Sequence, residues 1–206
     1  MTKKIKYLLL LMSLSITLCV MSNTYSKYAA DTTGSVEASF AKWQILVNTE
    51  DITAGAEKTL NITPTIEANS HVAANKLAPA STGYFDIEID PTNVEVSYDY
   101  RITLSAANES MPYVKINQYA ILDENYEEGN TITKTNVEND EITGTENYSA
   151  GGFKPYTVRV YFEWVEGSGE TMNDAADTAV GHNALNEDTD SIEMTATIHF
   201  EQKISD

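Results

Sequence analysis

The stretch from 94 to 104 alternates strictly between apolar and polar side chains. One parity carries Val94, Val96, Tyr98, Tyr100, Ile102 and Leu104, and the other carries Glu95, Ser97, Asp99, Arg101 and Thr103. Successive side chains of a β-strand point to opposite faces, so this period of two predicts a strand with one buried and one solvated face. Because a single strand is unstable in water, the rest of the chain must supply a sheet and a second layer.

Further alternating stretches predict the strands of those layers. They lie at 36–40, 43–47, 60–66, 85–89, 156–164 and 192–200. The parity changes between Phe40 and Trp43, which indicates a bulge or a strand that crosses between layers, and Pro64 weakens the strand at 60–66. After residue 26 only Met172 to Val180 could form a short helix. We therefore expect an all-β fold, an antiparallel β-sandwich of jelly-roll or immunoglobulin-like type.

Between about 106 and 155 the pattern is weaker. The apolar residues at 114–122 have a mixed period, and 131–135 and 141–145 look like short β segments. We interpret this region as an excursion outside the main sheets that ends at Gly151 and Gly152. The sequence thus predicts a single β-sandwich domain over 27–206, with one excursion at about 106–155.

Residues 1–26 have the order of a secretory signal peptide. Lysines at positions 3, 4 and 6 precede an apolar run from Leu8 to Met21, and small polar residues follow it. The run is shorter than the roughly 20 residues that a bilayer span needs, so cleavage near Tyr25 or Lys27 is expected, with an uncleaved anchor as the alternative. We expect contact with the membrane only before cleavage, and a secreted protein of the extracellular matrix or cell surface afterwards.

Charge and cysteine content narrow the classes of partner and chemistry. The formal net charge is −18, and it becomes −21 once the three signal lysines are removed. Such acidity argues against nucleic acid and anionic lipid as partners, and it makes close association of copies sensitive to salt and pH. The only cysteine, Cys19, lies in the signal, so the mature chain is expected to have neither disulfides nor thiol chemistry.

Catalytic and metal-binding patterns are weak. His71, His182 and His199 are far apart, and no His-Glu-x-x-His, activated-serine or phosphate-loop pattern is present. The candidate calcium ligands are the carboxylates of Asp174, Asp177, Asp188 and Asp190. They lack the spacing of an EF-hand loop, and a solvated acidic loop is the competing interpretation. We expect no catalytic residues and no cofactor other than calcium, and thus no enzyme.

Several segments carry a family resemblance. They are Asn-Thr-Tyr-Ser-Lys-Tyr at 23–28, Ala-Ser-Phe-Ala-Lys-Trp-Gln-Ile at 38–45, and the stretches 83–104 and 161–181. Together they resemble the TasA/camelysin-type exported proteins of Gram-positive bacteria, at both ends and in the middle of the chain but not over 111–153. The resemblance implies export with the help of a SipW-like signal peptidase. It also implies a jelly-roll subunit of extracellular fibres in a biofilm matrix.

Members of that family join by donating a new N-terminal strand to the next subunit. We expect the donor to run from about Lys27 to Ser39, because this polar, linker-like segment precedes the first core strand and main-chain pairing at a sheet edge needs little sequence-specific chemistry. The residues assigned to assembly into a fibre or homo-oligomer are Lys27, Tyr28, Val36, Ala38 and Phe40.

Two other functions stay open at this point. A monomeric secreted adhesin or binding module would be favoured by aromatic side chains displayed on the strand at 156–164. A metal-dependent peptidase, the activity attributed to camelysin, would need two histidines and a carboxylate to converge.

Overall fold

The computed structural model describes residues 3–27, 39–53, 58–60, 62–106, 114–165, 174–185 and 194–203. The chain divides into two compact units, Met1–Phe40 and Ala41–Asp206. The first unit contains helix α1 (Lys3–Lys27), which covers the segment expected to be a signal peptide. Among the described residues, neither this helix nor the second one has the length and apolar character that crossing a bilayer requires.

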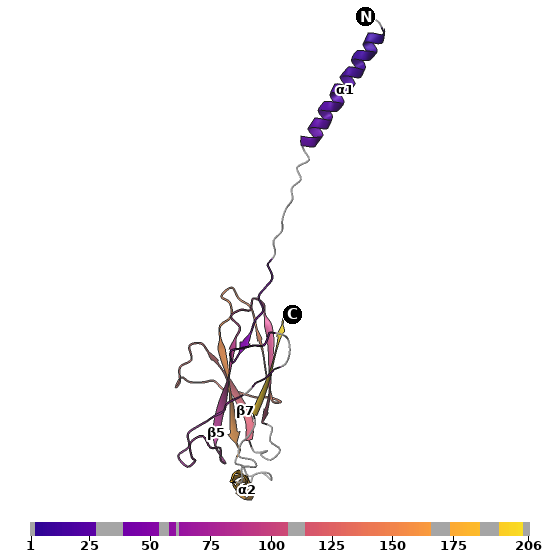
Figure 1. The fold of residues 1–206 in the computed structure, drawn as a ribbon. Helices are drawn as coiled ribbons and strands as arrows, with labels where there is room; N and C mark the ends of the chain where they lie inside the picture. Colours follow the sequence, from indigo (N-terminus) through magenta and orange to yellow (C-terminus); the bar gives the residue numbers. More distant parts are fainter. Residues whose placement is uncertain are drawn as a thin grey trace. The chain divides into compact units, whose positions relative to one another are not determined.

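The second unit is a sandwich of two antiparallel β-sheets (Figure 1). Its strands are β1 (Leu46–Val47), β2 (Glu50–Asp51), β3 (Lys58–Leu60), β4 (Thr65–Ile66), β5 (Thr82–Asp90), β6 (Tyr98–Ala106), β7 (Val114–Asp123), β8 (Thr135–Asn136), β9 (Glu141–Glu146), β10 (Tyr156–Trp164) and β11 (Met194–Gln202). Sheet A has the order β2-β1-β5-β10-β7-β8, with β4 also on β5, and sheet B has the order β3-β11-β6-β9. The expected all-β sandwich is confirmed.

The alternating stretch that begins at Val94 forms an inner strand of sheet B, β6, between β11 and β9. Its apolar parity faces the core, where Tyr98, Tyr100, Ile102 and Leu104 are all buried. The strand begins at Tyr98 and not at Val94, because the Val94 amide donates to the carbonyl of Pro91 in a turn. The alternation therefore begins before the strand that pairs in sheet B.

The interpretation of 106–155 as an excursion outside the sheets is wrong. β7 pairs with β10 along its length in sheet A, and β9 pairs with β6 in sheet B. The mixed period of 114–122 arises from an irregularity in the β7–β10 register, where Gln118 lies opposite Tyr161 and Ile116 opposite Phe162. Asn117 is thus an extra residue, and a bulge of this kind reverses the parity of the side chains that follow it.

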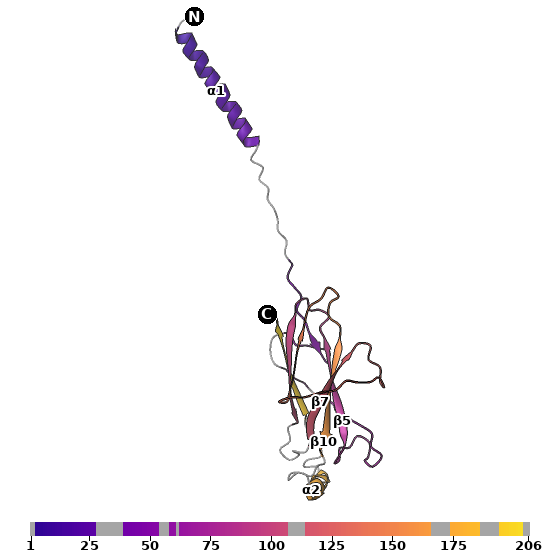
Figure 2. The same ribbon diagram turned by 180° about the vertical axis from the view of Figure 1, so that it is seen from behind.

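Two other expected strands differ from the structure. The stretch 60–66 is split into β3, in sheet B, and β4, in sheet A, with Pro64 between them. The expected strand at 43–47 is reduced to Leu46–Val47, and 36–38 lies outside the described residues. The expected short helix is α2 (Asp174–Ala184), which lies at the end of the sandwich away from the C-terminus (Figure 2).

Both ends of the sandwich chain are fixed by the segment between β5 and β6. The Gln44 amide donates to the carbonyl of Asn93 at 3.2 Å, and the Glu95 amide donates to the carbonyl of Lys42 at 2.9 Å. At the other terminus, the Lys203 amide donates to the carbonyl of Ser97 at 2.9 Å. The chain therefore enters and leaves the sandwich at the same end.

Replacing Gly83 with alanine should lower the free energy of unfolding by about 1–3 kcal/mol, the range for overpacking a well-packed core. A Cβ atom on Gly83 would overlap the Phe162 ring and the backbone carbonyl of Thr65, which cannot turn aside. The control is Gly181→Ala in α2, where a Cβ atom meets nothing and should be neutral or stabilising. Urea denaturation measures both changes, and equal effects would contradict this account of the packing.

Candidate assembly edge

One side of the sandwich leaves two strand edges without a described partner. β7 pairs with β8 only at Gln118 and Tyr119, so its outer edge from Ala120 to Leu122 has no pairing strand among the described residues. β9 pairs with β6, and on its other side the described chain makes only the Glu138–Glu141 bridge. Because the short connection 137–140 joins β8 to β9, these edges of sheets A and B lie on the same side of the sandwich. We call this region, residues 120–122 of β7 with residues 142–146 of β9, the β7–β9 seam.

The core face of β7 is only partly covered at this seam. Ile121 is the register partner of Val158, which is fully buried, and both side chains therefore project to the same face of sheet A. Ile121 is nevertheless 51% exposed. On β9, Ile142 is buried, but the next two positions on its core-facing side are Gly144 and Glu146, neither of which supplies an apolar side chain. The seam thus exposes an edge and an apolar side chain together.

Tyrosines occupy the core next to the seam. Tyr98 is fully buried, and neither its hydroxyl nor that of Tyr156 makes a hydrogen bond of regular geometry to any described residue. Burial raises the pKa of Tyr98 and Tyr156, and it raises the pKa of Tyr100 to about 12. Burial also raises the pKa of the Glu146 carboxyl. The polar atoms here therefore resist ionisation and lack strong partners.

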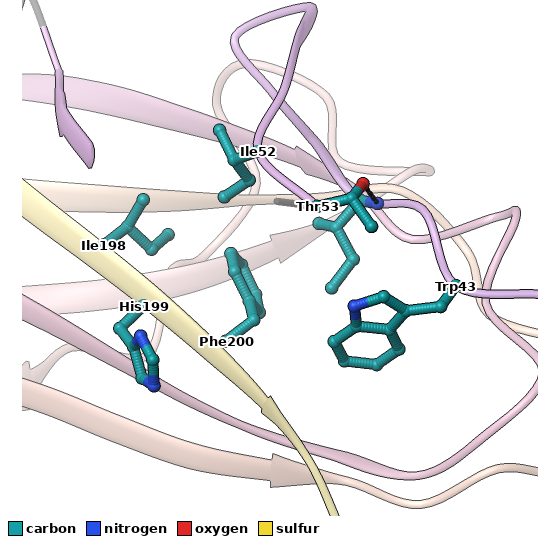
Figure 3. Close-up of a pocket in the computed structure, with 7 residues that line it drawn as sticks. Trp43, Ile52, Thr53, Ile198, His199 and Phe200 are labelled. Carbon is teal, nitrogen blue, oxygen red and sulfur yellow. Dashed lines mark hydrogen bonds between the residues drawn. The ribbon is translucent and has the colours of Figure 1, made fainter. Parts of the chain in front are cut away.

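The opposite side of the sandwich is better filled. Figure 3 shows its pocket, where the rings of Trp43 and Phe200 and the side chain of Ile52 meet between the sheets. The cavity is about 10 Å³, which leaves room for one water molecule at most. Trp43 also contacts Tyr98 edge-on, with 6.3 Å between ring centroids. This pocket consolidates the core and offers no space for a strand.

The outer face of sheet A carries a second, smaller core that the sequence did not reveal. The loop 124–134 between β7 and β8 folds back over this face. Its Tyr126 and Ile132 pack against Ala120, Leu122 and Tyr161. The ammonium group of Lys134 lies 3.7 Å from the centroid of the Tyr161 ring. The loop therefore covers outward-facing positions of β7 and β10, including Tyr161, which the alternation in β10 assigns to solvent.

Arg159 lies at the centre of this outer core. Its Nε and Nη2 atoms donate to the two carboxylate oxygens of Asp86, each at 2.8 Å, and its guanidinium lies 4.0 Å from the centroid of the Tyr84 ring. Glu128 of the loop approaches Nη1 at 3.7 Å. Hydrogen bonding to Asp86 raises the pKa of Arg159, so its charge is permanent. The alternating pattern gave no signal for this pair, because a buried Arg–Asp pair and a solvated one have the same parity.

Of the five residues assigned to assembly, the structure describes Lys27 and Phe40. Lys27 is the last residue of α1, while Tyr28, Val36 and Ala38 lie outside the described residues. Phe40 is described, and its side chain is 96% exposed. Phe40, which precedes the sandwich in the sequence, is thus a large apolar group that the described residues leave exposed.

The predicted metal ligands are not brought together in the part of the chain that is described. Asp174 and Asp177 lie on α2, and one buried carboxylate oxygen of Asp177 has no hydrogen-bond partner there. Asp188 and Asp190 lie outside the described residues. Over the described ranges, no group of three or more His, Cys, Asp or Glu side chains could hold a metal ion.

The aromatic residues of the strand at 156–164 do not form an exposed platform. Tyr161, Phe162 and Trp164 are buried, and Tyr156 is half-buried.

No protein-family model, curated protein or solved structure matches this chain.

Proposed function

We propose that the protein is an exported structural subunit that polymerises by strand exchange. In this proposal the donor segment from about Lys27 to Ser39, with the adjacent Phe40, pairs with the β7–β9 seam of the next copy. Each copy then has one donor and one acceptor, so the contact is head-to-tail and generates an open fibre.

The donor half of the proposal is supported mainly by Phe40, an exposed aromatic residue before the first core strand. Val36, Ala38 and Phe40 share one parity, with Glu37 and Ser39 on the other. An extended segment with this pattern presents one apolar and one polar face, as an added strand at a half-buried edge requires. Full burial of a phenylalanine is worth about 1.5–3 kcal/mol, which the single chain does not gain.

The acceptor half is supported by the coincidence of edge and apolar surface at the seam. Pairing along the outer edge of β7 would supply main-chain hydrogen bonds that this edge lacks among the described residues. The same strand could cover Ile121, which is half exposed although it lies on the core face.

The secreted binding module receives less support from the structure. A carbohydrate-binding sheet typically offers aromatic rings to solvent, but the rings of Tyr161, Phe162 and Trp164 are buried. Arg159 and Asp86, the most polar pair on that face, are engaged with each other beneath the loop 124–134. We therefore place the fibre subunit first.

Electron microscopy of the purified chain starting at Lys27 tests the proposal. This chain contains the whole sandwich, because the core residues all lie in the unit Ala41–Asp206. We expect fibres from it, and monomers from a chain that starts at Ala41 and lacks the donor and Phe40. Urea unfolding of the shorter chain is the control, and its midpoint should match that of the longer one. Fibres from the shorter chain would refute the donor assignment.

A further inference from the structure

Strand β9 carries an acid on its core-facing side. Ile142, Gly144 and Glu146 share that side, and Ile142 is almost completely buried. Thr143 and Thr145 face outward, where the Thr145 hydroxyl hydrogen-bonds to Asp99. Glu146 therefore continues the parity of the core and not that of the solvated face. A carboxyl group at this half-buried, core-facing position needs a polar partner or water.

The groups that face Glu146 are mostly phenols. Tyr98 is its register partner on β6, and Tyr100 is the next core-facing residue of that strand. β10 contributes Tyr156, whose pKa responds to the charge of Glu146, as do those of Tyr98 and Tyr100. From β7, Tyr119 lies near Tyr100 and Asp123 is the register partner of Tyr156. None of these groups is a cation.

No positive charge compensates the Glu146 carboxylate in the described structure. Glu146 takes part in no ion pair among the described residues. Lys154, in the loop that follows β9, instead pairs with Glu124, with 3.6 Å between its Nζ atom and the carboxylate oxygen. Buried hydroxyls of Tyr98 and Tyr156, which have no regular hydrogen bond, lie in the same cluster. A neutral carboxyl can both donate to and accept from such hydroxyls, whereas an ionised one must keep its hydration.

We propose that Glu146 is a proton-dependent latch of the β7–β9 seam, which is closed against the tyrosine cluster when neutral and drawn toward water when ionised. Burial raises the pKa of this carboxyl in the folded state above its value in the unfolded chain. The folded state therefore binds the proton more tightly, and the stabilisation is complete below the ordinary carboxyl pKa. It is lost as the pH rises through the raised value.

The latch has a consequence for assembly, and this part rests on the proposed function. The donor segment carries Asp31 and Glu37 but only one lysine, Lys27, and it would approach an ionised Glu146 at the seam. Like charges at a partly desolvated contact repel, so protonation of Glu146 should favour docking of the next copy. Acidification would then promote fibre growth.

Urea unfolding of the chain from Lys27, measured from about pH 4 to about pH 8, tests the latch without fibres. The variant is Glu146→Gln, which imitates the neutral carboxyl, and the matched control is Glu141→Gln, the outward acid at the start of the same strand. At the acidic end of this range, the urea midpoints of wild type and Glu146→Gln should coincide. Toward neutral pH the wild-type midpoint should fall below that of Glu146→Gln, while Glu141→Gln follows the wild type. If the urea midpoint of Glu146→Gln depended on pH in the same way as that of wild type, the latch would be overturned.

Fibre growth by the same three proteins separates this inference from the function on which it rests. We expect Glu146→Gln to assemble at a higher pH than either wild type or Glu141→Gln. Because both variants lose one negative charge relative to wild type, a difference between them cannot come from net charge. If the unfolding profiles differ as expected but no fibres form at any pH, the proposed function fails and the latch stands. If fibres form with the same pH dependence in all three proteins, the latch fails as a regulator.

Discussion

Arg159→Ala should lower the free energy of unfolding by about 3 kcal/mol, among the largest losses expected from a single residue of this protein. The side chain of Arg159 is 9% exposed and forms two parallel hydrogen bonds with Asp86. Its removal leaves Asp86 without its charge partner and opens a space beneath Tyr84. Because Asp86 itself is 34% exposed and can recover some hydration, we expect the lower end of the range for a broken buried pair.

The matched control is Arg101→Ala, on the solvated face of β6. This arginine is exposed and alternates with the buried residues of the same strand. Its removal should change stability by less than about 0.5 kcal/mol. Denaturation in urea at neutral pH measures both variants. If Arg159→Ala were as mild as Arg101→Ala, the outer core described over sheet A would be incorrect.

Phe40→Asp should raise the critical concentration for fibre assembly at least about tenfold and leave the stability of the single chain unchanged. A tenfold change corresponds to about 1.4 kcal/mol, which is less than the full burial of a phenylalanine contributes. The single chain should be indifferent, because Phe40 is 96% exposed there. Sedimentation of fibres over a concentration series measures the critical concentration.

Leu185→Asp provides the comparison for that experiment. Leu185 follows α2 and is 75% exposed, so the substitution removes an exposed apolar group and adds the same charge at a position unrelated to the seam. It should leave the critical concentration close to that of wild type. If both substitutions raised the critical concentration equally, the effect of Phe40→Asp would come from the added charge and not from the lost aromatic ring.

Alternation predicted the inner strands of this fold well. β5, β6, β10 and β11 each have one face in the main core, and such strands must repeat with a period of two. The pattern failed at the edge strands for identifiable reasons. The extra residue Asn117 reversed the parity of β7, and Gly144 removed an apolar position from β9. Edges bury less surface, so their sequences carry less of the pattern.

The seam and the outer core could not be predicted from the sequence. The exposure of Ile121 depends on which strand lies opposite it, and that is a property of topology. Arg159 and Asp86 are 73 positions apart and become partners only because β5 and β10 pair in sheet A. The proposed donor, in contrast, rests on the sequence, since Val36, Ala38 and Phe40 alternate within a polar segment.

Cysteine cross-linking between copies tests strand exchange at the seam most directly. The only native cysteine is Cys19, so a chain that starts at Lys27 has none. One copy carries Ile121→Cys, and the other carries a single cysteine in the donor at 36, 38 or 40, or at the opposite-parity positions 37 and 39. A disulfide requires Cα atoms within about 7 Å, so only a donor position beside β7 can react.

We expect mixed oxidation to give a covalent dimer for at least one of the three apolar-parity positions, and little for positions 37 and 39. Leu185→Cys in place of Ile121→Cys should give none. A dimer that depends on residue 121 and on the parity of the donor would establish the edge pairing. Absence of a dimer at all three apolar-parity positions, or equal yields at both parities and at residue 185, would contradict it.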